Sequence, residues 1–188
     1  MALRTGRRYL QGSIELTLAN LWIAENPEVG EEHLLRGQAI ARQLDDRELE
    51  VDVNVALARL ARTRGDLRSA QAALRQATTQ LPQTGDVLRL AGSTWQEWAE
   101  LAEAQNMRDG QVALLWAIAA LYAEGNSSAA AAAYWEQAER AAARTETPEG
   151  RLGLAARARA TLAEDDGWGL LTELFGRFDT DDQAKSNS

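Results

Sequence analysis

Turn signals divide this chain of 188 residues into segments of helical length. Its three prolines all stand beside turn-forming residues, and pairs such as Gly65-Asp66 and Gly125-Asn126 add further breaks. The stretches between these breaks are rich in Ala, Leu, Arg, Gln and Glu, which are strong helix formers. Their apolar residues recur at helical spacing, and no stretch shows the sustained alternation typical of a strand. The sequence therefore predicts an all-α fold.

The predicted helices form an array of hairpins. They cover residues 8–25, 30–44, 48–64, 67–81, 86–105, 110–124, 127–144, 149–164 and, in a shorter helix, 167–177. The eight longer helices make four αα-hairpins, which start near residues 8, 48, 86 and 127. A period of about 40 residues is typical of helical-repeat solenoids, whose repeats bury their apolar faces against their neighbours. We therefore expect a right-handed α-solenoid of about four hairpins with a C-terminal capping helix.

Composition excludes several classes of site. Twenty basic against 28 acidic residues give a formal charge of −8, so nucleic acid is not an expected partner. The chain has no cysteine and one histidine, which excludes disulfides, thiolate nucleophiles and multi-histidine metal sites. That histidine, His33, is expected to be an exposed surface residue. No P-loop, dinucleotide fingerprint or nucleophile elbow occurs, so we predict no cofactor, metal or catalysis; a helical enzyme with paired carboxylates stays an alternative.

The hydropathy pattern bears on location. The longest uncharged apolar run, residues 112–123, has twelve residues, whereas a helix that crosses a bilayer needs about 20. We therefore expect no direct membrane insertion. The expected location is cytoplasmic, or periplasmic if a leader was removed. The oligomeric state stays open at this point.

Residues 54–82 carry the pattern of a two-helix repeat. The positions that define it are Leu57, Ala58, Gly65, Asp66, Ala70, Leu74, Ala77 and Pro82. Small residues at 58, 70 and 77 allow the two helices to approach closely, and Gly65 permits the turn between them. The pattern resembles a tetratricopeptide repeat (TPR), with Asn54 at a position where that repeat usually has Trp. A weaker copy covers residues 114–138.

The resemblance implies that the first helix of each hairpin lines a concave groove, which binds a peptide or a partner protein. Asp52, Val55, Arg59 and Arg62 share one helical face, which by resemblance is this groove. Two arginines one turn apart can hold a carboxylate, although a solvated face paired with nearby acids explains them equally well. The partner-binding residues that we predict are Val55, Arg59, Arg62, Arg89, Trp116 and Tyr122.

Tryptophan is frequent in this chain, with six residues against two phenylalanines. Trp95 and Trp98 form a helical stripe with Ala91 and are expected in the core. Trp116 and Tyr122 would either stack on a bound peptide or pack between hairpins.

Looser motifs between residues 50 and 164 resemble the TPR domains of the c-type cytochrome assembly machinery. They are Asp86-Val87-Leu88-Arg89-Leu90-Ala91, Ala113-Leu114-Leu115-Trp116 and Ala133-Tyr134-Trp135-Glu136-Gln137-Ala138. In that family the domain holds unfolded apocytochrome and presents it to the haem-attachment enzymes. This resemblance implies an assembly factor or chaperone, within the broader expectation of a non-catalytic scaffold or adaptor.

The C-terminal segment from Trp168 to Phe178 is amphipathic. Its apolar face consists of Trp168, Leu171, Phe175 and Phe178. This face would either cap the last hairpin or dock into another protein, together with the convex face of the array, as part of a larger complex. The expected division is an N-terminal hairpin at 1–47, a TPR-like domain at 48–164, a capping or docking helix at 165–178 and a disordered acidic tail at 179–188.

Overall fold

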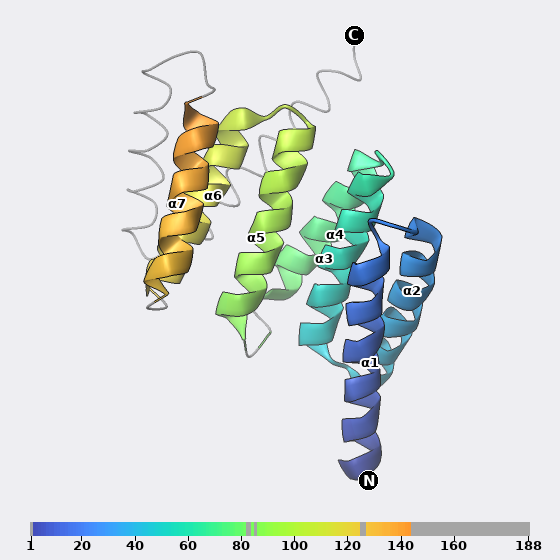
Figure 1. Cartoon of the computed structure of the whole chain (residues 1–188). Helices are drawn as coiled ribbons and strands as arrows, with labels where there is room; N and C mark the ends of the chain where they lie inside the picture. The colour runs from blue at the N-terminus through green and yellow to red at the C-terminus, as the bar shows by residue number, and fades with distance from the viewer. Residues whose placement is uncertain (1, 82–83, 85, 125–126, 144–188) are drawn as a thin grey trace. The chain divides into compact units, whose positions relative to one another are not determined.

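The structure, a computed structural model, describes residues 2–81, 84, 86–124 and 127–143 (Figure 1). The elements in these ranges are all α-helices, with no strand among them, which confirms the predicted all-α class. They are α1 (Ala2–Trp22), α2 (Pro27–Leu44), α3 (Arg47–Thr63), α4 (Leu67–Gln80), α5 (Val87–Ala104), α6 (Arg108–Glu124) and α7 (Ser128–Ala142). The helices predicted at 149–164 and 167–177 lie outside the described residues.

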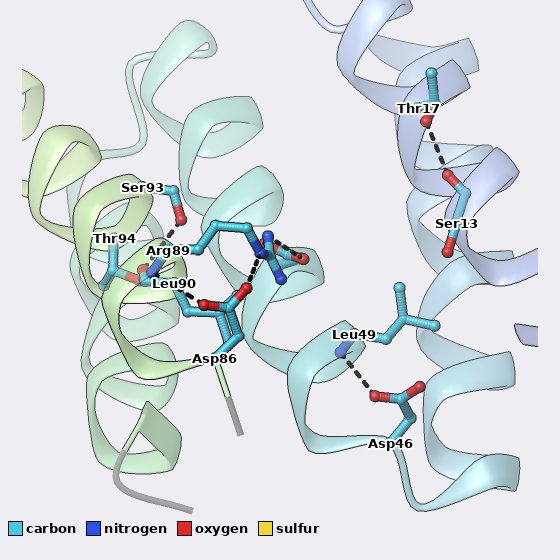
Figure 2. A network of polar contacts seen from close by, with 10 residues as sticks. Ser13, Thr17, Asp46, Leu49, Asp86, Arg89, Leu90, Ser93 and Thr94 are labelled. Carbon is cyan, nitrogen blue, oxygen red and sulfur yellow. Dashed lines mark hydrogen bonds and ion pairs between the residues drawn. The ribbon is translucent and has the colours of Figure 1, made fainter. Parts of the chain in front are cut away.

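Helix starts in the first half of the chain are set by Asx caps. Four side chains each accept a hydrogen bond from the backbone N–H three residues later, at 3.0–3.4 Å: Asn26, Asp46, Asp66 and Asp86. Figure 2 shows the cap that Asp46 provides for Leu49. The caps lie twenty residues apart, so one helix and its turn occupy twenty residues and a two-helix unit occupies forty.

Two predicted helix starts were wrong. α2 begins at Pro27 instead of residue 30, because Asn26 caps it and proline is favourable in the first helical turn. α1 begins at Ala2 instead of residue 8 and ends at Trp22, so that Gly6 lies within the helix.

The chain divides into two compact units, residues 1–105 and 106–188. In the first unit α1 packs on α2 and α3, and α2 packs on α3. The next step repeats this order, since α3 packs on α4 and α5 while α4 packs on α5 (Figure 1). In the second unit α6 packs on α7. In the first unit, α1 and α3 therefore each contact the next odd-numbered helix as well as their own hairpin partner.

The core of the first unit lies between these helices. One cluster joins Ala19 of α1, and Ile23 just after that helix, to Leu34 of α2 and to Ala56 and Leu60 of α3. The small residues predicted at the helix contacts are all buried, namely Ala58, Ala70 and Ala77. Trp95 and Trp98 are buried as predicted, and the indole N–H of Trp98 donates to the Thr78 hydroxyl at 3.2 Å. The helices of this unit are thus held by close contacts of small and aromatic residues.

The α1–α2 connection depends on a close backbone approach at Gly30. A Cβ at this position would lie 3.1 Å from the backbone nitrogen of Ile23 and 3.2 Å from its Cα. Those atoms belong to the main chain that leaves α1, so they cannot rotate away as a side chain can. A Cβ at position 30 would therefore require these main-chain atoms to move by a few tenths of an ångström, which glycine avoids.

We predict that Gly30→Ala lowers the free energy of unfolding by about 1–2 kcal/mol, because the added methyl group overpacks the connection. Urea denaturation followed by circular dichroism measures this change. Gly6→Ala is the matched control, since a Cβ there has no atom within 4 Å. It should raise stability by up to about 1 kcal/mol through helix propensity. Equal effects of the two substitutions would contradict the packing described here.

Candidate functional site

Charged side chains join α3 to α5 along their length, and we call this set the α3–α5 ladder. It consists of Asp52, Arg59 and Arg62 on α3 and Arg89, Glu97 and Glu100 on α5. At one end Arg89 donates to Asp52 at 3.1 Å and also to Asp86, the cap of its own helix, at 2.9 Å. Figure 2 shows Arg89 reaching over Asp86. Each α3–α5 ion pair of the ladder joins an acid on one helix to a base on the other, and each helix contributes both kinds of residue.

The centre of the ladder is the carboxylate of Glu97. The Arg59 Nε–H donates to its Oε2 at 3.1 Å, and the Arg62 Nε–H donates to its Oε1 at 2.7 Å. Glu97 is 1% exposed, whereas Arg59 is 39% exposed. A buried carboxylate is costly unless it is paired and hydrogen-bonded, and here each oxygen has a charged donor.

Arg62 has a second acid beside it, because it also donates to Glu100. Burial lowers the pKa of the Arg62 guanidinium, but the hydrogen bond and charge of Glu97, with the charge of Glu100, outweigh burial and raise the pKa overall. Arg62 therefore stays cationic and acts as a permanent link between α3 and α5.

A third helix reaches the same site. Arg59 donates a further hydrogen bond to the side-chain oxygen of Asn20 on α1, at 3.0 Å. The two partners of Arg59 lie 39 residues before it and 38 residues after it. The Asp52–Arg89 pair spans 37 residues. The odd-numbered helices therefore meet at a nearly constant separation in sequence.

The predicted binding residues of the first unit lie in different environments. Arg59, Arg62 and Arg89 come together in the ladder, and each already pairs with a carboxylate of the chain. Val55 is buried in the core. Residues 51–82 contain five arginines against two aspartates, and acids of α5 partly balance this local excess of positive charge. A role of these residues in binding a partner stays a prediction.

The aromatic candidates lie in the α6–α7 hairpin. Trp116 is buried, with its ring centroid 6.2 Å from that of Trp135. Tyr122 stacks on Tyr134 with centroids 5.4 Å apart and an interplanar angle of 3°. These contacts agree with packing between helices, and ligand contact stays a prediction. The predicted docking residues Trp168, Leu171, Phe175 and Phe178 lie outside the described residues.

His33 was predicted to be exposed, and this was wrong. Its Nδ1 lies 2.7 Å from Glu15 Oε2, and the two side chains are 16% and 14% exposed. The prediction considered only the acids beside His33 on its own helix, whereas α1 packs against that face and brings Glu15 to it. Sequence reasoning also missed Glu97 and Glu100, which lie one turn apart on α5 at about the same separation from Arg59 and Arg62.

Two further findings concern other kinds of site. Among the residues that the structure describes, no group of three or more His, Asp or Glu side chains is arranged to hold a metal ion. No helix within those ranges combines the length and apolar character that crossing a bilayer requires.

In comparisons with known proteins, no family model matches the sequence, no curated protein is significantly similar to it, and no solved structure matches it.

We predict that Glu97→Gln lowers the free energy of unfolding by about 3 kcal/mol, because it leaves the Arg59 and Arg62 charges beside each other without the carboxylate. Chemical denaturation at neutral pH measures the loss. Glu100→Gln is the control, since Glu100 is 42% exposed and its loss should cost less than about 1 kcal/mol. If both variants were equally stable, the buried carboxylate would not hold α3 to α5.

We predict that Asp52 makes the stability of the fold depend on pH. Burial raises the pKa of this carboxyl above 3.8, and the nearby Arg89 offsets only part of that rise. The folded state therefore takes up the Asp52 proton at a higher pH than the unfolded state does. As the pH falls from 7 toward 3.8, the wild type should gain stability relative to Asp52→Asn. Urea unfolding of both proteins across this range measures the difference.

Asp66 provides a control, because its contribution to stability should change in the opposite direction as the pH falls. Its hydrogen bonds from Ser69 lower its pKa below 3.8, so its contribution to stability is present above that value and is lost as the pH falls through the lowered pKa. The wild type should therefore lose stability relative to Asp66→Asn in acid. A common trend for the two pairs of proteins would contradict the environments assigned to these carboxyls.

Proposed function

We propose that this protein is a non-catalytic scaffold or adaptor, built as a short TPR-like helical-repeat array, which binds a segment of a partner protein on its odd-numbered helices. The observation that carries the proposal is the recurring separation of 35 to 39 residues between hydrogen-bonded side chains on successive odd-numbered helices. Caps every twenty residues and the repeated order of helix contacts also support it. Arrays of this kind offer a continuous row of first helices to a ligand.

The α3–α5 ladder is the part of this row that would bind the partner. Its most buried member is the acid Glu97, while the bases Arg89 and Arg59 are 51% and 39% exposed. A ligand that approaches the ladder therefore meets guanidinium groups more than carboxylates. Each guanidinium has five N–H donors in a planar fork, and Arg59 uses two of them within the chain. We infer that the bound segment carries acidic side chains, which accept the remaining donors.

The finer proposal, an assembly factor of the c-type cytochrome maturation type, rests on the motif resemblance between residues 50 and 164. In this finer proposal the partner would be an unfolded apocytochrome, and it would bind to the same α3–α5 ladder.

The proposal is tested by quantitative capture from a lysate of the native organism. Arg59→Ala/Arg89→Ala should reduce recovery of the specific partner about tenfold, because two charge-assisted hydrogen-bonding groups are removed. The matched control is Arg42→Ala/Arg68→Ala, which removes two exposed arginines from the even-numbered helices α2 and α4. This control should retain the partner.

Thermal unfolding of both double variants separates lost binding from lost folding, since Arg62 still pairs with Glu97 in each of them. Equal recovery with both variants would show that the ladder is not the binding face. Raising the salt concentration should weaken capture by the wild type, because exposed ion pairs are screened.

A further inference from the structure

α1 carries a row of exposed apolar side chains along one side. Leu10, Ile14 and Leu21 are 61%, 57% and 64% exposed. They follow one another at intervals of four and seven residues, so they lie on one line along the helix. Thr17 continues this line, and its hydroxyl donates to the Ser13 carbonyl at 2.9 Å, which satisfies it within the helix (Figure 2). We call these four residues the α1 seam.

The seam lies opposite the side by which α1 joins the fold. That side consists of Gly12, Leu16, Ala19 and Ile23, which face α2 and α3. α1 is thus apolar on two opposite sides, and one of them faces solvent. A helix at the surface of a monomer needs only one such side.

The seam has the spacing of a coiled-coil interface. Residues 7, 10, 14, 17, 21 and 24 alternate in steps of three and four, which is the a/d pattern of a heptad repeat. Backbone hydrogen bonds from Ile23 to Ala19 and from Asn26 to Trp22 continue the helical path beyond the last of these positions. A row this narrow fits one helix.

We propose that the α1 seam pairs two copies of this chain, with their α1 helices antiparallel. In this arrangement Leu10 of each copy packs on Leu21 of the other, and Ile14 packs on Thr17. Arg7 and Glu25 are both exposed and lie near opposite ends of the seam, so each Arg7 comes beside Glu25 of the other copy. A parallel pair would instead place Arg7 against Arg7. The antiparallel pair has twofold symmetry, as most homodimers do.

This self-association is independent of the proposed function, because none of the seam residues belongs to the α3–α5 ladder. A single pair of helices buries less surface than a standard interface, so we expect a dissociation constant on the order of 10 µM.

Sedimentation velocity of the full chain over a range of concentrations tests the pairing. The wild type should shift from monomer to dimer as the concentration rises, and Leu10→Glu/Leu21→Glu should stay monomeric throughout. The control is Leu35→Glu on α2, where the leucine is 55% exposed and off the seam. It should dimerise like the wild type. A wild type that stays monomeric at every concentration would overturn the proposal. Co-sedimentation with anionic lipid vesicles covers the other occupant of an exposed apolar face: a wild type that binds these vesicles but does not dimerise would also overturn it.

A charge exchange tests the antiparallel register. Arg7→Glu and Glu25→Arg should each weaken the homodimer about tenfold, because both contacts become like-charged. Mixing the two variants should restore dimers, since every contact in the mixed pair again joins opposite charges. Circular dichroism confirms that each variant is folded, as expected for exposed sites. If each variant alone dimerises as well as the mixture does, the antiparallel pairing is wrong.

Discussion

The buried carboxylate of Glu97 is the constraint on which the first unit depends most. It is 1% exposed, and Arg59 and Arg62 each donate to one of its oxygens. A buried carboxylate is costly without such partners. This requirement restricts how far α5 slides along α3, because a shift of one turn, about 5 Å, would separate the carboxylate from at least one of its two donors. It also fixes Arg59 in the position from which it reaches Asn20 on α1. One side chain thereby sets the register of three helices.

The same register links packing to the proposed binding face. Small residues such as Ala58 and Ala70 let the helices of a hairpin approach closely, which brings the odd-numbered helices near enough for ion pairs to form between them. Once those pairs form, Glu97 is buried, while Arg59 and Arg89 remain partly accessible. The charge that a ligand meets is therefore decided by relative burial within the ladder, although the chain as a whole is acidic.

Helix spacing and turn signals are local properties, so the all-α class, the seven described helices and the burial of Trp95 and Trp98 could be predicted from the sequence. The partners of Arg59 and Arg62 could not, because periodicity defines a face of one helix but not its alignment with the next. His33 was misjudged for the same reason, since Glu15 reaches it from another helix. The recurrence of Asn or Asp at 26, 46, 66 and 86 was the available signal, because caps at a constant interval imply a constant register.

The α1 seam, like the α3–α5 ladder, is a line of side chains that can join one helix to another. The ladder does so through ion pairs, and the seam would do so through apolar contacts. In the first unit, α1 and α3 each contact both a hairpin partner and another odd-numbered helix. The solvent-exposed side of a surface helix is usually polar, because an apolar side exposed to water gains nothing from folding. Leu10, Ile14 and Leu21 depart from this rule at three of the four positions of the α1 seam. A surface that continues the helical array into a second helix accounts for all three positions, and Arg7 and Glu25 determine in which direction that second helix runs.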